Sequence, residues 1–148
     1  MPSTDMSDTA TDGPARVVRR FLEALAAADV DTAVDLVADD IVYQNVSLPT
    51  IHGKRRIERG AQACVERGLH FDVRIHRIAE SGSTVLTERT DAISWGAFRS
   101  QFWVCGTFEV SDGKVTLWRD YFDWGAITAA TLRGAIATVV PSLRARFD

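Results

Sequence analysis

The chain has 148 residues and a net charge of −3 at pH 7, and 46% of its residues are hydrophobic and 25% charged. These values are those of an ordinary globular domain that is long enough to bury a sizeable core. The net charge is mildly acidic, whereas a nucleic-acid-binding protein has an excess of basic residues. No apolar run approaches the ~18 residues that cross a membrane. We therefore expect neither a nucleic-acid partner nor a membrane span.

The first 13 residues are polar and acidic, without the charged-then-apolar order of a secretory signal. We expect residues 1–13 to form a disordered tail and residues 14–148 to form a single domain. The two cysteines, Cys64 and Cys105, have neither metal-ligand spacing nor the pattern of a disulfide framework. We expect both thiols to be buried, inert and reduced, as in a cytoplasmic protein.

The first half of the domain has the apolar periodicity of helices. Pro14 suits a first helical turn, and the apolar residues from Val17 to Leu25 recur at helical spacing. Asp29 or Asp31 can cap a second, short helix. The expected elements are a helix from Pro14, a short helix that ends at Asp39–Asp40, a strand over residues 41–46, an irregular connection around Pro49 and Gly53, and a basic helix from Lys54 to a stop at Gly68.

From His70 the apolar and polar residues alternate, which is typical of strands with one buried face. Ser81–Gly82 is a turn, Trp95–Gly96 a loop, and Asp112–Gly113 the centre of a hairpin signal. Helices followed by hairpin-connected strands predict an α+β fold, with an antiparallel sheet, N-terminal helices over one face and a cavity between them. The four expected strands lie over residues 71–78, 86–93, 100–110 and 115–124, and a helix over residues 126–140 follows.

Three strands carry polar side chains on faces where the alternation demands apolar ones. Side chains two residues apart share a face, so Arg89 and Asp91 point the same way as Val85 and Ile93. If the three faces line one cavity, it is mostly apolar with a few convergent polar groups, as in a small-molecule site. The residues on these faces are Tyr43 and Asn45, Arg89 and Asp91, and Trp118, Asp120, Phe122 and Trp124.

The charges on these faces favour acid–base chemistry. One arginine balances only one of two ionised carboxylates, and two carboxylates in a dry site have their pKa values pushed apart. One of Asp91 and Asp120 would then act as a base and the other as an acid, while Arg89 holds both through its fork of donors. A nearby phenol and amide can orient water, and the set lacks a nucleophile. Such a set suits the one-step addition of water to an epoxide.

Three motifs stand in chain order, namely Tyr43-x-Asn45, Arg89-x-Asp91 and Trp118-Arg119-Asp120-Tyr121-Phe122-Asp123. Together they resemble the limonene-1,2-epoxide hydrolase family over about residues 17–124. The resemblance implies a fold similar to nuclear transport factor 2 and steroid delta-isomerase, in which a strongly curved mixed sheet of about six strands forms a cone closed by helices. It also implies a homodimer that needs no metal and no organic cofactor.

Carried over residue by residue, the resemblance assigns a role to each polar group. Asp120 is the base that takes a proton from water, and Tyr43 and Asn45 hold that water. Asp91 is the acid that protonates the epoxide oxygen, and Arg89 bridges the two carboxylates. The substrate-pocket wall would include Trp118 and Phe122, with Trp95, Phe98 and Phe102 as further candidates, which favours a small lipophilic epoxide.

Other interpretations of these residues stay open. Arg89 and Asp91 alone could form a structural ion pair, and Asp123 faces away from the predicted site by parity. Two alternative functions are an isomerase or lyase of the same fold acting on a steroid- or polyketide-like substrate, and a non-catalytic lipid-binding module. The histidines, His52, His70 and His76, are expected on the surface or in loops.

Overall fold

One six-stranded sheet, with the strand order β2-β1-β6-β5-β4-β3, organises the chain. The computed structural model describes residues 12–147, so most of the expected tail over residues 1–13 lies outside the described residues. The strands are β1 (Val37–Asn45), β2 (Ile51–His52), β3 (His70–Ser81), β4 (Thr84–Trp95), β5 (Phe98–Ser111) and β6 (Lys114–Phe122). The helices are α1 (Pro14–Ala26), α2 (Val30–Asp35), α3 (Lys54–Glu66) and α4 (Trp124–Ala137), with a 3-10 turn over Pro141–Leu143.

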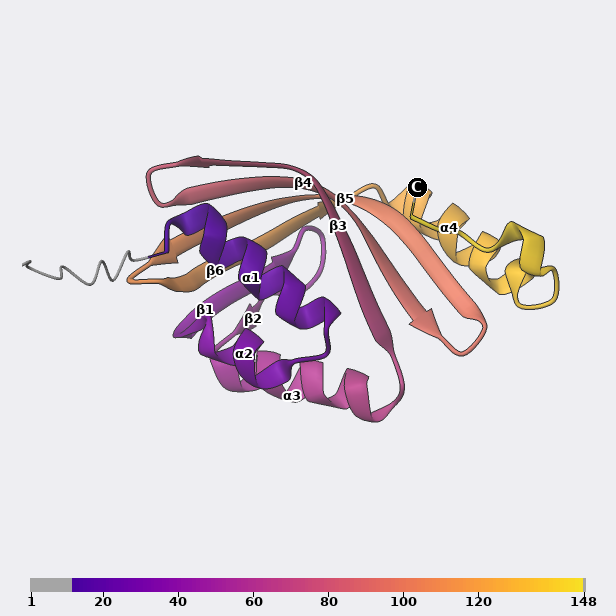
Figure 1. Ribbon diagram of the computed structural model, residues 1–148, viewed down its shortest axis with the longest axis horizontal. Coiled ribbons are helices and arrows are strands. Elements are labelled where there is room, and N and C mark those ends of the chain that lie inside the picture. The colour runs from indigo at the N-terminus through magenta and orange to yellow at the C-terminus, as the bar shows by residue number, and fades with distance from the viewer. Residues whose placement is uncertain (1–11, 148) are drawn as a thin grey trace, which may run out of the picture.

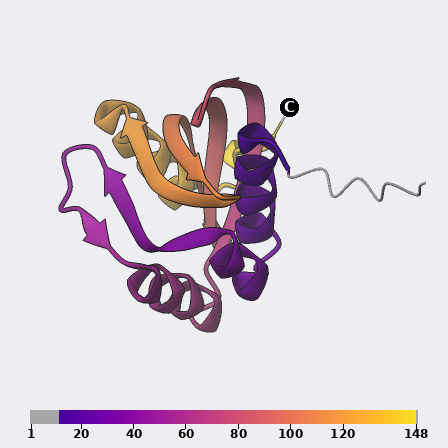
Figure 2. The ribbon, with the colours of Figure 1, turned by 90° about the vertical axis from the view of Figure 1, so that its left-hand side faces the viewer.

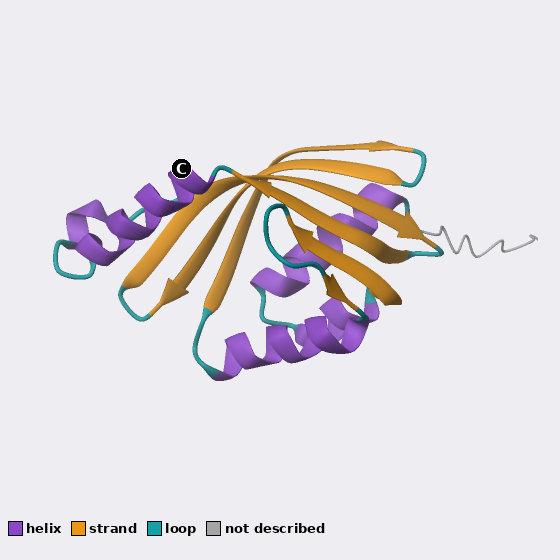
Figure 3. Ribbon diagram, turned by 180° about the vertical axis from the view of Figure 1, so that it is seen from behind, coloured by secondary structure: helices purple, strands orange, loops and turns teal. Residues whose placement is uncertain are grey.

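The sheet is mixed but largely antiparallel. β1 and β6 run parallel to each other, and every other neighbouring pair is antiparallel. The strands bend so that the sheet has a concave face; α1, α2 and α3 lie on that side, and α4 lies apart from them against β5 (Figures 1, 2 and 3). This arrangement confirms the predicted α+β class and the curved, cone-like sheet closed by the N-terminal helices. Within residues 12–147 no helix is long and apolar enough to span a membrane.

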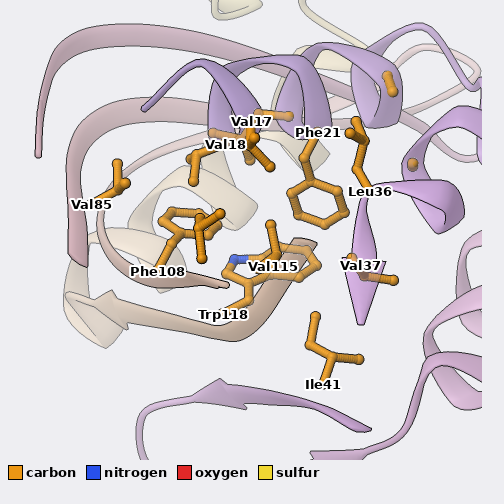
Figure 4. Close-up of a cluster of buried hydrophobic side chains, with 14 of the residues drawn as sticks. Val17, Val18, Phe21, Leu36, Val37, Ile41, Val85, Phe108, Val115 and Trp118 are labelled. Carbon is orange, nitrogen blue, oxygen red and sulfur yellow. The ribbon is translucent and has the colours of Figure 1, made fainter. Parts of the chain in front are cut away.

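α1 covers the concave face through the apolar stripe expected from its sequence. Pro14 stands in the first helical turn, where its missing N–H costs no hydrogen bond. Phe21 is fully buried and meets Trp118 edge-on, with 5.1 Å between ring centroids, and Phe108 stacks on Trp118 in the same core (Figure 4). The core therefore fills the space between α1 and strands β5 and β6.

The second helix is shorter than predicted. Asp29 caps α2, as one of the two candidates, but the helix ends at Asp35 rather than at Asp39–Asp40. Val37, expected inside the helix, instead begins β1 and pairs with Val115 of β6. Pairing with a strand far along the chain decides this boundary, and local helical periodicity does not contain that information.

Two further boundaries differ from the prediction. Ile51–His52 forms β2 where the sequence predicts an irregular connection, because these residues pair with β1. β6 ends at Phe122, and the side chain of Asp123 caps α4 by accepting the backbone N–H of Ala126 at 3.1 Å. Trp124 therefore lies in α4 and is exposed, and its predicted place on the pocket face of the last strand is wrong.

Both cysteines are exposed, so their predicted burial is wrong. Cys64 lies on α3, and Cys105 lies on the convex face of β5. Its neighbours Val104 and Gly106 are buried, and alternation along the strand turns the side chain of Cys105 outward.

Candidate active site

A cavity of about 470 Å³ lies between α3 and the concave face of the sheet. Most of its wall is apolar and comes from α1, α3 and the sheet, with Leu25, Ile57, Val65, Ile93 and Phe102 among its members. A mostly apolar cavity with a few polar groups is typical of a small-molecule site. The predicted catalytic residues that line it are Tyr43, Asn45, Asp91 and Asp120.

The predicted wall residues divide into two groups. Trp118 and Phe122 line the cavity, and so does Phe102. Trp95 and Phe98 are not among the lining residues, because they flank the turn between β4 and β5. The aromatic wall is therefore built mainly from β5 and β6.

The histidines have different surroundings. His70 lines the cavity at the start of β3 and is exposed, as expected. His76 stacks on Trp103, with 4.5 Å between ring centroids, and its Nε2 lies 2.7 Å from the Thr90 hydroxyl. His52 lies in β2 and is exposed. Among residues 12–147, no hydrogen bond or ion pair joins any of these three histidines to Arg89, Asp91 or Asp120.

Asp91, Arg89 and Asp120, the charged triad, are buried beside this cavity. Arg89 donates from Nε to Asp91 Oδ1 at 2.9 Å and from Nη2 to Asp91 Oδ2 at 3.1 Å. Its Nη2 also lies 2.7 Å from Asp120 Oδ2. The guanidinium thus joins carboxylates of β4 and β6 across β5. Charges buried this deeply need close partners of opposite sign.

The two oxygens of Asp120 have different surroundings. Oδ2 forms the ion pair with Arg89 and accepts the indole N–H of Trp118 at 2.9 Å. Oδ1 is buried and accepts no hydrogen bond from the described residues. A carboxylate oxygen with free lone pairs can take a proton from water.

Burial raises the pKa of both carboxyl groups of the triad. The pKa of Asp91 rises to about 6, because loss of hydration outweighs the attraction of Arg89. The pKa of Asp120 also lies above its usual range through burial, although contacts with Arg89 and Trp118 oppose the rise. Burial lowers the pKa of Arg89, but the two carboxylates more than offset this, so the guanidinium stays charged.

Tyr43 and Asn45 form a polar pair on β1. The Asn45 amide donates from Nδ2 to the Tyr43 hydroxyl at 2.9 Å, and the Tyr43 ring stacks on Trp118 with 4.0 Å between centroids. Parallel pairing of β1 with β6 sets Asn45 beside Asp120 and Tyr43 beside Trp118. Burial, and then the charge of Asp120, raise the pKa of Tyr43 to about 12, so it is a neutral phenol at ordinary pH.

Two contacts of the triad were missed by the sequence analysis. The Thr87 hydroxyl accepts a hydrogen bond from Arg89 Nη1 at 3.1 Å, and Trp118, predicted only as pocket wall, donates to Asp120. Each residue stands two positions before the charged side chain that it contacts. The signal was present, since residues i and i+2 share a face of a strand.

This arrangement can both give and take protons at one wall of the cavity. One guanidinium neutralises one of two carboxylates, so a proton held by the triad leaves one carboxyl group as acid and the other as base. Tyr43 and Asn45 offer hydrogen bonds to a small polar molecule beside Asp120. Among residues 12–147, no cluster of His, Cys, Asp and Glu side chains could hold a metal ion.

Sequence comparison relates this chain to known epoxide hydrolases. The family model of the limonene-1,2-epoxide hydrolase catalytic domain matches residues 12–133. Epoxide hydrolase EphG of Mycobacterium tuberculosis (strain ATCC 25618 / H37Rv) is 51% identical over 128 residues, which cover 86% of this chain and 85% of that protein. These matches confirm the resemblance drawn from the three motifs.

Structural comparison gives the same relationship and a wider set of similar folds. The structure of an M. tuberculosis LEH-like epoxide hydrolase matches with a TM-score of 0.87 and 49% identity, covering 90% of this chain and 95% of that chain. A candidate ketosteroid isomerase from Kribbella flavida DSM 17836 has a TM-score of 0.61 at 19% identity, covering 74% of this chain and 77% of that chain. At so low an identity the second likeness concerns the fold alone.

Proposed function

This chain belongs to the limonene-1,2-epoxide hydrolase family, and we propose that it adds water to a lipophilic epoxide to give a vicinal diol. One observation carries the proposal: Arg89 lies buried between Asp91 and Asp120, and these two carboxylates line an apolar cavity. A purely structural role gives no reason for two carboxylates to share one guanidinium beside a cavity. An acid and a base at one wall are what the opening of an epoxide by water requires.

The reaction is a single step in which a base and an acid act together. The Asp120 carboxylate takes a proton from a water molecule held by Tyr43 and Asn45, while the water oxygen attacks one ring carbon. As the bond between this carbon and the epoxide oxygen breaks, Asp91 gives its proton to that oxygen. Arg89 stays charged and bridges the carboxylates, so the triad ends with the proton on Asp120 in place of Asp91.

The surroundings of the two carboxyl groups support these roles. With a pKa of about 6, Asp91 keeps a substantial share of its protons in mildly acidic solution. The contacts of Arg89 and Trp118 with Asp120 Oδ2 favour the ionised form of Asp120, and Oδ1 has free lone pairs for a proton. Water is the nucleophile, so the mechanism needs no covalent enzyme intermediate.

The cavity favours a lipophilic substrate. Its wall consists mostly of aliphatic and aromatic side chains, including Ile57, Phe102 and Phe122. Burial of apolar substrate surface against this wall supplies most of the binding free energy. The triad and the Tyr43–Asn45 pair are then left to orient the epoxide ring and the water.

Asp120→Asn tests the assignment, since it keeps the shape of the side chain and removes the base. We expect turnover of terpene, fatty-acid or steroid epoxides to fall by about 10²–10⁴-fold, with the fold retained. Asp112→Asn, in the exposed turn between β5 and β6, is the matched control and should turn over like the unaltered protein. Retention of most of the activity in Asp120→Asn would exclude Asp120 as the base.

Single-turnover hydrolysis in water labelled with heavy oxygen separates direct attack from a covalent route. Direct attack places the label in the diol during the first turnover. An unlabelled diol, with the label in a carboxylate of Asp91 or Asp120, would instead show an ester intermediate and contradict the one-step mechanism.

The two alternative functions give different results with the same substrate panel. An isomerase or lyase would convert a steroid- or polyketide-like substrate without adding water, and a lipid-binding module would bind epoxides without turnover. The candidate ketosteroid isomerase shares only the fold with this chain. A lone catalytic base does not need Arg89 between two carboxylates, so the hydrolase is the better-supported function.

We also infer that the protein forms a homodimer. α4 packs on β5 but leaves Leu132 and Ile136 exposed, Val139 is exposed just after the end of this helix, and Trp103 is exposed on the convex face of the sheet. Exposed large apolar side chains on a helix and a neighbouring strand are what a subunit interface would cover. The cytoplasmic location stays a prediction from the sequence.

A further inference from the structure

The side chain of Arg89 has to cross a neighbouring strand to reach Asp120. β5 lies between β4, which carries Arg89, and β6, which carries Asp120. Gly106 of β5 stands at the crossing point, since it pairs with Thr87 on β4 and with Asp120 on β6. The guanidinium therefore lies over the backbone of Gly106.

Gly106 provides the space for this crossing. A Cβ atom here would overlap Arg89 Nη1 and would lie 2.8 Å from Thr87 Oγ1 and 2.9 Å from Asp120 Oδ1. Contacts under 3.0 Å force the surrounding atoms to shift, and here those atoms belong to the triad and its partner. The backbone of Gly106 does not have a positive φ, so the requirement for glycine is one of space and not of backbone conformation.

Thr87 holds the remaining nitrogen of the guanidinium. Its buried hydroxyl accepts from Nη1 at 3.1 Å, while Nε and Nη2 contact the carboxylates of Asp91 and Asp120. Each of the three guanidinium nitrogens therefore has a partner. Because the group is planar, these three contacts fix its orientation.

We propose that Gly106 and Thr87 are positioning residues, which hold Arg89 in contact with both carboxylates. Neither residue is among those that line the cavity, so neither touches the substrate. The inference rests on the proposed function, in which Arg89 contacts Asp91 and Asp120 during one step. A substitution at Gly106 or Thr87 should therefore lower the rate of the chemical step and leave substrate binding intact.

Thr87→Val and Thr87→Ser form a matched pair, because only the second keeps the hydroxyl acceptor. We expect Thr87→Val to lower kcat by about 10-fold, the effect of one lost hydrogen bond to a charged group, with KM unchanged within a factor of about two. Thr87→Ser should keep a kcat close to that of the unaltered protein. Thr107→Val, paired with Leu86 across β4 and β5, is a control outside the site and should leave kcat unchanged.

The pH profile distinguishes positioning from a loss of stability. A guanidinium that is held less firmly stabilises the Asp120 carboxylate less, so the acid limb of kcat/KM should move to higher pH in Thr87→Val. A variant that is merely less stable keeps this limb in place. Unaltered kcat together with an unaltered acid limb in Thr87→Val would overturn the proposal.

Gly106→Ala tests the space over β5. We expect kcat to fall by about 100-fold or more, because displacement of reacting groups by an ångström has effects of this size. Circular dichroism and thermal melting show whether the variant folds. A folded Gly106→Ala protein with normal kcat would overturn the proposal, and for a protein that does not fold the Thr87 pair decides.

A measurement without any epoxide tests the positioning role of Thr87 separately from the proposed function. Carbon NMR titration of the Asp91 and Asp120 carboxyl groups should give higher pKa values in Thr87→Val than in the unaltered protein. If that shift occurs in a protein that hydrolyses no epoxide, the proposed function fails and the positioning role is supported. Unshifted pKa values of Asp91 and Asp120 would overturn the positioning role, whatever the activity.

Discussion

Arg89 is the largest of the fully buried side chains in the described part of the chain, and its burial shapes the chemistry of its neighbours. Taking a guanidinium out of water costs several kcal/mol, and close carboxylates offset that cost. One positive charge cannot stabilise two negative ones equally, and burial raises the pKa of both Asp91 and Asp120. The triad therefore keeps a proton at a pH where exposed carboxyl groups have lost theirs.

We expect turnover to fall as the pH rises above about 6, the pKa of Asp91, because the proposed acid then loses its proton. The stability of the fold should also fall as the pH rises. The pKa of Asp91 is higher in the folded protein than the 3.8 of a free carboxyl group, so the unfolded state ionises first. The free energy of unfolding should fall as the pH rises from about 4 to about 6 through this group. Steady-state kinetics on both sides of the Asp91 pKa measure the first effect, and urea denaturation between about pH 4 and about pH 6 measures the second.

Asp91→Asn is the control for this pH dependence. It removes the titrating group, so the free energy of unfolding should vary less over the same pH range, and turnover should be low throughout. An identical pH dependence of stability in the variant and the unaltered protein would contradict the raised pKa of Asp91.

Tyr43 should act as a neutral hydroxyl and not as a titrating acid. Its pKa of about 12 lies above the working range. We expect Tyr43→Phe to lower kcat by about 10-fold through lost hydrogen bonding, and to leave both limbs of the pH profile in place. Phenylalanine keeps the stack on Trp118, so thermal stability should change little. Disappearance of the basic limb in this variant would identify Tyr43 as the titrating group.

Among the elements, α3 and α4 contain glycines in opposite environments. A Cβ atom at Gly60 of α3 would have no heavy atom within 4 Å. Gly134 of α4 is buried, and a Cβ there would overlap the carbonyl oxygen of Arg99 and lie 3.0 Å from the ring of Phe98. The close approach of α4 to β5 therefore depends on Gly134, whereas Gly60 only weakens its helix.

Alanine at these two positions should change stability with opposite signs. Gly60→Ala should raise the free energy of unfolding by about 0.5–1 kcal/mol, because alanine has less backbone freedom to lose on folding. Gly134→Ala should lower it, because α4 has to move away from β5. Urea denaturation of both variants measures the difference, and a stabilising Gly134→Ala would contradict the close packing of α4.

At the scale of the whole molecule, a closed core and an open cavity share one concave face. Trp118 stands between them, with Phe21 against it on the core side (Figure 4). On the other side, Tyr43 stacks on Trp118, and both residues line the cavity. The space under α1 is filled with apolar side chains, whereas α3 and the sheet enclose room for a substrate. Stability and the proposed chemistry thus depend on different parts of the same face.

The proposed homodimer is tested at this scale by Ile136→Glu. Ile136 is half-exposed on α4, and a carboxylate buried in an apolar interface is costly, so the variant should sediment as a monomer. Gln62→Glu, exposed on α3, adds the same charge elsewhere and should sediment like the unaltered protein. A monomeric unaltered protein in sedimentation velocity would refute the homodimer.

Strand alternation made the short-range half of the site predictable. Tyr43 and Asn45, like Arg89 and Asp91, are two residues apart, and a period of two puts such pairs on one face whatever the rest of the chain does. The same local rule contained the contact between Arg89 and Thr87. The order of helical and alternating stretches likewise determined the α+β class, because each pattern is complete within its own segment.

Only the tertiary structure decided which of these faces meet. Sheet register brings Asp120 to Arg89 and places Gly106 beneath the guanidinium. Pairing of Val37 with Val115 also turned the predicted end of a helix into a strand. Register depends on contacts between residues far apart in the chain, and a pattern read within one segment carries no information about its partner strand.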